Sequence, residues 1–320
     1  MTRQPQTRSN VLSVAICTHN RADLLAGVLD TLCAQTADRA DYEVIVVDNG
    51  STDRTRQLAQ LYALRCSTVR YAYEPRVGLS HARNRALQEA TGQYVAYVDD
   101  DCRLPPHWVA AVREVIARLR PAACGGPLLT WYATARPRWY RDEYASHIQG
   151  DVSRPLGADE YLDGGNIALR RSLLAELGGF DPGLGMTGKR IAYGEETALL
   201  RRIRAERPHE TIYYDPRIVA YHLVRPEKMT LRRIARQCLC SGHAAYHVFG
   251  PAPGCRGGGR VLLWKRAARA LGALTAGFAR ALLFRDRRQF PYIQNDLCER
   301  VLPRLQTFGR IVEQCRQECG

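Results

Sequence analysis

The sequence predicts an α/β protein with a largely parallel sheet. In the first hundred residues, short runs of β-branched and aromatic residues alternate with longer segments that have the apolar spacing of amphipathic helices. This alternation, at intervals of about 25 to 30 residues, is typical of βαβ units. We expect strands at 11–16, 43–47, 68–73 and 94–98, and helices at 22–36, 53–64 and 78–90, the second of these helices capped by Ser51 or Asp53.

Each expected strand is followed by a polar turn. Right-handed crossovers bring the carboxyl ends of parallel strands to one edge of the sheet, which is where open α/β sheets bind ligands. We therefore expect these turns to face one crevice: 17–21, 48–51, 74–76 and 99–101.

The remainder of the chain is predicted to be mixed and then helical. The segment 131–159 is aromatic and irregular, as long functional loops often are. Further helices are expected at 105–120, from Ser172 to Gly178, at 195–206, 230–250, 261–284 and 295–316, with strands or extended segments at 122–129, 161–169, 211–214 and 218–221.

Composition limits the class of protein and its partners. The formal net charge is +14, almost all of the positive charge is arginine, and most of the excess lies beyond Pro226. Such a tail suits phospholipid headgroups, nucleic acid or a phosphorylated substrate. The eleven cysteines are scattered, residues 1–10 are polar, and no apolar run approaches the ~18 residues of a membrane span. We expect reduced thiols and a cytoplasmic protein.

Three consecutive carboxylates, Asp99, Asp100 and Asp101, follow the fourth strand. These like charges repel one another, and no basic residue interrupts the run. A hard divalent cation would neutralise them, because such cations prefer carboxylate oxygens. The alternative is a solvated acidic loop.

A series of short motifs then resembles, in order, those of family 2 glycosyltransferases. The motifs span about residues 11–225 and begin at Ser13, Val46, Gly78, Tyr97, Gly164, Gly178, Gly194 and Tyr221. The resemblance implies a GT-A fold, with a Rossmann-like, mixed but mostly parallel sheet flanked by helices. It also implies a nucleotide-sugar donor and a divalent metal, Mn²⁺ or Mg²⁺.

The resemblance also implies metal ligands. By the match to the family's DxD motif, Asp101 is the leading ligand, while Asp99 and Asp100 contact the ribose or the metal. His222 matches a later histidine that can complete the metal shell, and an imidazole ligand would favour Mn²⁺. Taken without the resemblance, His222 would be interpreted as a core histidine at a strand end.

The nucleotide sugar should be bound by residues of the first turns and of the glycine motif. The residues implied are Thr18, His19, Arg21, Asp48, Asn49, Arg83, Asn84, Asp99, Asp100, Gly165 and Asn166. The family often has two acids where this chain has Asp48 and Asn49. Arg83 and Asn84 are alternatively part of an exposed helix face.

An acceptor hydroxyl needs a general base. The family usually has Glu-Asp, with the second acid as base, where this chain has Glu195 and Glu196. We assign Glu196 as the base, with Glu195 as a positioning residue or the alternate base. Both acids alternatively only complement a helix N-terminus. The resemblance implies inversion at the anomeric carbon.

We therefore expect a catalytic domain at 1–225, with a nucleotide-binding part at about 10–102 and an acceptor part at about 103–225, and a basic helical extension at 226–320. The expected function is transfer from a UDP- or dTDP-linked sugar to a glycan, a lipid-linked glycan or another glycoconjugate, in polysaccharide biosynthesis. A small natural product as acceptor, and a non-catalytic nucleotide-sugar-binding module, are the alternatives.

The basic tail supplies the last expectation. Apolar and basic residues mix over 261–288, which suits a helix lying on an anionic membrane surface. A helix packed on protein is the alternative. Nucleic acid is not expected, because the aromatic residues of the tail form no stacking platform.

Overall fold

The computed structural model describes residues 11–188, 192–252 and 260–319. Internal packing divides the chain into two compact units. The first comprises Met1–Trp131, Ser146–Gly183 and Glu195–Leu223, and the second comprises Tyr132–Ala145, Leu184–Gly194 and Val224–Gly320. The second unit therefore includes two segments from within 1–225, where a single catalytic domain was expected. The functional division of the chain near residue 225 stays a prediction.

The first unit is built on an eight-stranded sheet in the order β3-β2-β1-β4-β9-β6-β10-β8. Its first four strands are parallel, as predicted, and their carboxyl ends meet at one edge. They are β1 (Leu12–Thr18), β2 (Tyr42–Asp48), β3 (Val69–Tyr73) and β4 (Tyr94–Asp99).

Beyond β4 the sheet becomes mixed. β9 (Asn166–Arg170) runs antiparallel to both β4 and β6 (Ala123–Gly125). β6 pairs in parallel with β10 (Ile212–Tyr214), and β8 (Arg154–Pro155) is the antiparallel edge. Because β9 is antiparallel, its first residues lie beside the last residues of β4.

A second sheet of three strands supports the end of β4. It has the order β5-β11-β7, with β5 (Cys102–Arg103), β11 (Ala220–Leu223) and β7 (Leu128–Trp131). His222 was expected after a strand at 218–221 but lies inside β11, where it pairs with Cys102. The antiparallel pairing with β5 brings the imidazole next to the acidic end of β4.

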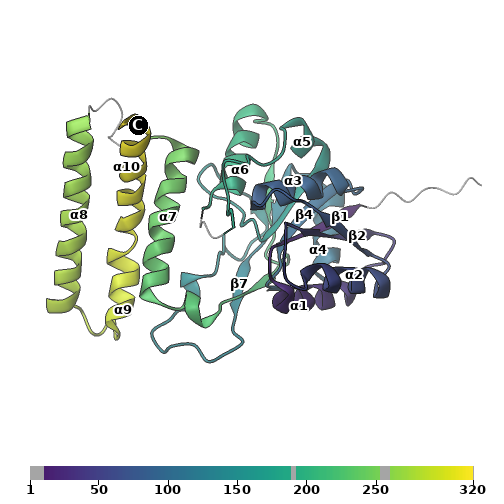
Figure 1. Cartoon of the computed structure of the whole chain (residues 1–320), viewed down its shortest axis with the longest axis horizontal. Coiled ribbons are helices and arrows are strands. Elements are labelled where there is room, and N and C mark those ends of the chain that lie inside the picture. Colours follow the sequence, from purple (N-terminus) through teal and green to yellow (C-terminus); the bar gives the residue numbers. More distant parts are fainter. Residues whose placement is uncertain (1–10, 189–191, 253–259, 320) are drawn as a thin grey trace, which may run out of the picture. The chain divides into compact units, whose positions relative to one another are not determined.

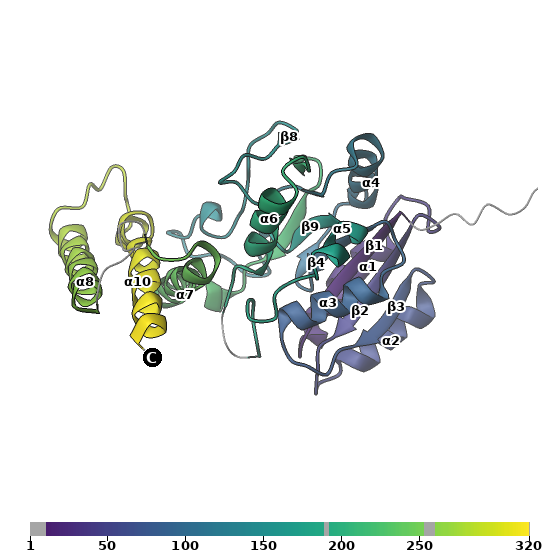
Figure 2. The same ribbon diagram turned by 90° about the horizontal axis from the view of Figure 1, so that it is seen from above.

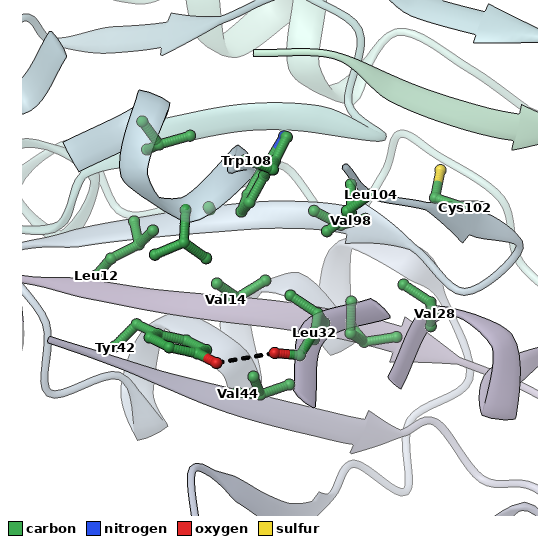
Figure 3. Close-up of a cluster of buried hydrophobic side chains, with 14 of the residues drawn as sticks. Leu12, Val14, Val28, Leu32, Tyr42, Val44, Val98, Cys102, Leu104 and Trp108 are labelled. Atoms are coloured by element: carbon green, nitrogen blue, oxygen red, sulfur yellow. Dashed lines mark hydrogen bonds between the residues drawn. The ribbon is translucent and has the colours of Figure 1, made fainter. Parts of the chain in front are cut away.

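Helices cover both faces of the large sheet (Figures 1 and 2). One face carries α1 (Ala22–Cys33), α2 (Thr55–Arg65) and α4 (Trp108–Leu119), and the other carries α3 (Leu79–Glu89), α5 (Arg171–Glu176) and α6 (Glu195–Glu206). Figure 3 shows the first of these two cores, where the hydroxyl of Tyr42 donates to the carbonyl of Leu32 at 2.8 Å. Two packed layers thus hold β1 and β4 rigidly at the centre.

Helix starts differ from the prediction in detail. The N-cap of α2 is Arg54, although the Asp53 carboxylate accepts a hydrogen bond from the Thr55 amide at 2.9 Å. Ser172 does not cap α5, because that helix begins one residue earlier with Arg170 as its N-cap. The helix predicted over 195–206 is confirmed.

The second unit is helical. It contains η1 (Asp142–Tyr144), η2 (Pro226–Lys228), α7 (Leu231–Phe249), α8 (Arg260–Leu283), α9 (Ile293–Asp296), a π-helical turn η3 (Leu297–Val301) and α10 (Arg304–Cys319). α10 lies between α7 and α8 (Figures 1 and 2). A Cβ atom on Gly242 would lie only 2.1 Å from the Gln306 carbonyl oxygen, so this glycine permits the close approach of α7 and α10. The single helix predicted over 295–316 is wrong, because η3 interrupts it.

One side of α8 is exposed although it is apolar. The buried residues of α8 are spaced by four or seven positions and pack in the core shared with α10: Leu263, Ala267, Leu274 and Ala281. Trp264, Leu271 and Phe278, seven residues apart and so on one side of the helix, are 59%, 51% and 40% exposed. Leu274, in contrast, belongs to the core. Within the described residues, no helix is both long enough and apolar enough to cross a membrane.

We predict that Gly126→Ala destabilises the protein by about 2 kcal/mol or more, because backbone atoms crowd this position. A Cβ there would lie 2.3 Å from the Ile218 carbonyl oxygen and 2.4 Å from that of Asp215. The control is Gly27→Ala in α1, where a Cβ meets nothing within 4 Å and should stabilise the helix by about 0.5–1 kcal/mol. Urea midpoints measure both, and equal midpoints for the two variants would contradict the packing described.

Candidate active site

The acidic end of β4 and the imidazole of β11 form one cluster. Asp99, Asp101 and His222 each offer a ligand atom, and these atoms lie within 4.8 Å of one another. His222 Nε2 is 3.2 Å from Asp101 Oδ1. Two carboxylates and an imidazole are a donor set that transition-metal dications accept. The structure thus brings together the three residues predicted as metal ligands.

Burial makes this cluster electrostatically unfavourable without a cation. Burial raises the pKa of Asp99, and the nearby Asp101 carboxylate raises it further. Burial likewise raises the pKa of Asp100 to about 6, against the opposing charge of Arg21. Each carboxylate would be stabilised by a positive charge beside it. The residues therefore fit a divalent cation in both ligand chemistry and charge.

Arg21 partly supplies such a charge. Its Nη1 donates to Asp100 Oδ1 at 2.8 Å and to Asp101 Oδ2 at 3.3 Å. No local pattern predicts this pairing, because Arg21 lies 79 residues before Asp100. Arg21 thus contacts Asp100 and Asp101, and Asp101 lies between Arg21 and His222.

Arg83 is a buried cation and not part of an exposed helix face. The residue is 3% exposed and its guanidinium lies over the rings of Phe180 and Tyr97, at 5.2 and 5.8 Å from their centroids. It donates to Glu195 Oε1 at 2.8 Å and to the Gly164 carbonyl at 3.1 Å. Arg83 therefore joins α3, α6 and the loop before β9.

The two glutamates that open α6 have different surroundings. Glu195 is 5% exposed and is fixed by Arg83, whereas Glu196 Oε2 is 4.0 Å from the same guanidinium. Burial raises the pKa of Glu196 well above its usual value, and Glu195 and Asp163 raise it further against the charge of Arg83. A raised pKa makes a carboxylate a better proton acceptor, which is the property that a general base needs.

Asp163 was not among the predicted site residues. Its Oδ1 accepts a hydrogen bond from the Gly165 amide at 2.8 Å, and its charge raises the pKa of both Asp99 and Glu196. A Cβ on Gly165 would lie 2.7 Å from Asp99 Oδ2, so only glycine fits between these acids. Its position two residues before Gly165 was the feature of the sequence that could have identified Asp163 as a site residue.

Asn84 and Asn166 use their side-chain amides to hold the fold. Asn166 is fully buried; its amide donates to the carbonyls of Pro127 and Ile218, and its oxygen accepts from the Trp108 indole. The Asn84 side chain donates to the Phe180 carbonyl and accepts from the Phe180 amide, both at 2.8 Å. These contacts give both side chains a structural role, and their predicted roles at the diphosphate and the donor sugar stay predictions.

Asn49 has a similar structural role. Its amide nitrogen donates to the carbonyls of Glu74 and Arg76, and its oxygen accepts from the Gly78 amide. It therefore shapes the turn between β3 and α3, and its side chain is not free to recognise a nucleobase.

Thr18, His19 and Asp48 lie at the same sheet edge. His19 Nδ1 is 2.7 Å from the backbone carbonyl oxygen of Asn49, and the backbone N–H of Asn49 donates to the backbone carbonyl of Thr18. Asp48 accepts from the Ser51 amide at 2.9 Å and from the Tyr71 hydroxyl at 3.0 Å. The expected convergence of the first two turns is thus present, with Asp48 as its buried acid.

Comparisons with known proteins agree with this geometry. The succinoglycan biosynthesis protein ExoM of Rhizobium meliloti is 27% identical over 238 residues, 72% of either chain. Validoxylamine A glucosyltransferase of Streptomyces hygroscopicus is 37% identical over 114 residues, which are 35% of this chain and 27% of that protein. The mannosyltransferase PcManGT of Pyrobaculum calidifontis, solved with GDP-Man and Mn²⁺, superposes with a TM-score of 0.54 at 19% identity, over 99% of this chain and 80% of that one.

The structural likeness confirms the expected GT-A fold. The family model described as "Glycosyl transferase family 2" matches residues 13–178, more than half of the sequence. The chain therefore belongs to the family 2 glycosyltransferases, enzymes that act on nucleotide-sugar donors.

Proposed function

We propose that this enzyme is a metal-dependent, inverting glycosyltransferase that uses a UDP- or dTDP-linked sugar in polysaccharide biosynthesis. The observation that carries the proposal is the proximity of a metal-type cluster to a buried carboxylate base. Asp163 connects the two electrostatically, because it raises the pKa of both Asp99 and Glu196. One site would thus bind the donor diphosphate at the metal-type cluster and place the acceptor hydroxyl at the carboxylate base.

In this proposal Asp99, Asp101 and His222 hold Mn²⁺ or Mg²⁺. When bound, the cation supplies Lewis-acid stabilisation of the charge that develops on the leaving diphosphate. The imidazole favours Mn²⁺, which is also the metal in the PcManGT complex. Arg21, held by Asp100, adds a second positive charge on the nucleotide side.

Glu196 is the proposed general base. It would take the proton of the acceptor hydroxyl, and its raised pKa makes it a better proton acceptor than an ordinary carboxylate. Glu195 would act as a positioning residue, since its hydrogen bond to Arg83 fixes the start of α6. Attack on the face opposite the leaving group inverts the anomeric carbon.

The acceptor is proposed to be a glycan, a lipid-linked glycan or another glycoconjugate. The match to ExoM, a succinoglycan biosynthesis protein, spans 72% of each chain and favours polysaccharide chemistry. The match to validoxylamine A glucosyltransferase keeps a small natural product as a second candidate, but it spans only 27% of that protein. The presence of a complete acid set disfavours a non-catalytic module.

We further propose that the enzyme is cytoplasmic and binds an anionic membrane surface through 261–288. The apolar side of α8 formed by Trp264, Leu271 and Phe278 is exposed. Exposed Lys265 and Arg269 lie on the same helix and supply the complementary charge for anionic headgroups.

We predict that Mn²⁺ stabilises the protein in the presence of UDP and that His222→Gln removes most of this effect. A ligand at about a hundred times its Kd stabilises by about 2.7 kcal/mol, which a thermal shift detects. The control is His209→Gln, at an exposed histidine. Equal Mn²⁺-dependent shifts in wild type and His222→Gln would exclude His222 as a ligand.

For the base, we predict that Glu196→Gln lowers transfer or donor hydrolysis about 10²- to 10⁴-fold. The assay is release of UDP or dTDP from a panel of nucleotide sugars with Mn²⁺. Binding of UDP and Mn²⁺ should persist, because the amide keeps the side-chain shape. Glu176→Gln, at an exposed glutamate of α5, serves as the control. Full activity in Glu196→Gln together with its loss in Glu195→Gln would make Glu195 the base.

For the membrane surface, we predict salt-sensitive cosedimentation with vesicles that contain phosphatidylglycerol. The double variant Trp264→Ala/Phe278→Ala should bind about tenfold more weakly, because it loses exposed apolar area. Leu64→Ala is the matched control, since Leu64 is an 87% exposed residue of α2. Unchanged binding of the double variant would assign the interaction to another surface.

A further inference from the structure

An exposed aromatic ring lies beside the proposed active site. Tyr161 is 38% exposed, whereas Tyr42, Tyr97 and Tyr214 of the same unit are buried. It precedes Asp163 by two residues, and Asp163 is hydrogen-bonded to Gly165 next to Asp99. The ring is therefore tied through a short segment to the acids of the site.

His147 fixes this ring in place. The two rings are stacked, with centroids 4.3 Å apart and planes inclined by 28°. His147 is itself anchored to β7, because its backbone amide donates to the Leu128 carbonyl and its carbonyl accepts from the Leu128 amide. Its Nε2 also lies 2.9 Å from the Tyr161 carbonyl oxygen. One face of Tyr161 is thus held by the sheet through His147.

Polar contacts brace the loop around the two rings. Arg154 donates to both carboxylate oxygens of Glu160, at 2.7 and 2.5 Å, and to the Gln149 carbonyl at 3.0 Å. Gln149 Nε2 donates to the Tyr161 carbonyl at 3.1 Å. In the same loop the apolar residues Ile148 and Val152 are 56% and 62% exposed. The loop 147–161 is thus held by hydrogen bonds and exposes both apolar and polar side chains.

The hydroxyl end of Tyr161 is within electrostatic range of the proposed base. Burial raises its pKa, and the carboxylates of Asp163 and Glu196 raise it further. The ring therefore lies near the proposed base, and its stack with His147 holds it there.

We propose that Tyr161, backed by His147, is an acceptor subsite that binds the C–H face of a pyranose ring. This inference rests on the proposed function and narrows its acceptor to a carbohydrate. A sugar ring presents C–H groups on one face and hydroxyls at its edge. An exposed aromatic ring fits this C–H face of the sugar. Ile148 and Val152 extend the apolar surface to a second residue of an oligosaccharide.

The test is binding of the full chain, with UDP and Mn²⁺, to an array of oligosaccharides that differ in their terminal pyranose. Wild type should be retained on a subset of the sugars. Tyr161→Ala should weaken that binding about tenfold, which corresponds to the loss of one stacking contact. Tyr161→Phe is the matched control, because it keeps the ring and should bind within about twofold of wild type. Tyr161→Leu, which keeps apolar bulk without a flat ring, should behave as Tyr161→Ala does.

Thermal shifts with UDP and Mn²⁺ on the same preparations separate this inference from the proposed function. Wild type that is stabilised by UDP and Mn²⁺ but retained on no oligosaccharide would overturn the subsite alone. Equal retention of Tyr161→Leu and wild type would do the same. Wild type that binds oligosaccharides in a Tyr161-dependent way, yet shows no stabilisation by nucleotide or metal, would support the subsite and overturn the proposed chemistry.

Discussion

The arrangement of the acids at the end of β4 and at the start of α6 depends on the contacts of the buried Arg83 guanidinium. It lies between two aromatic rings and bonds to Glu195 and Gly164, so three segments that are distant in the sequence meet at one cation. Removing one partner of a buried ion pair leaves a buried charge and costs about 3 to 5 kcal/mol. The positive charge of Arg83 lowers the pKa of both Asp99 and Glu196. Without Arg83, the acids at the end of β4 and at the start of α6 would lose this shared counter-charge.

The sequence was sufficient to predict the first half of the fold and the chemical groups of the site. Alternating strands and helices predict the four parallel strands, and strand ends predict which residues reach the ligand edge. The acids and His222 could be found because their chemistry is visible in one residue at a time. The structural hydrogen bonds of Asn49, Asn84 and Asn166 could not be predicted, for the opposite reason. Whether an amide is free depends on partners 25 to 96 residues away, which no local pattern reveals.

For the same reason, the sequence could not predict the pairing of Arg21 with Asp100 or which residues of α8 are buried. In an arginine-rich chain, one more arginine in a polar turn carries little information, and only the parallel register of β1 and β4 brings it to the acidic triplet. On α8 the apolar residues form two adjacent stripes. Leu274 and Trp264 look alike in the sequence, yet one is in the core and the other is 59% exposed. Separating the stripes requires knowing where α10 packs.

The antiparallel direction of β9 has a consequence for how this enzyme can diversify. The strand begins where β4 ends, so the Gly164–Asn166 turn is fixed against the donor-side acids by sheet hydrogen bonds. The chain that leads into it, 146–161, is attached to the sheet mainly through Leu128, β8 and the Tyr214 hydroxyl. Insertions or substitutions in that stretch would alter the surface offered to an acceptor without shifting the register of β4 and β9.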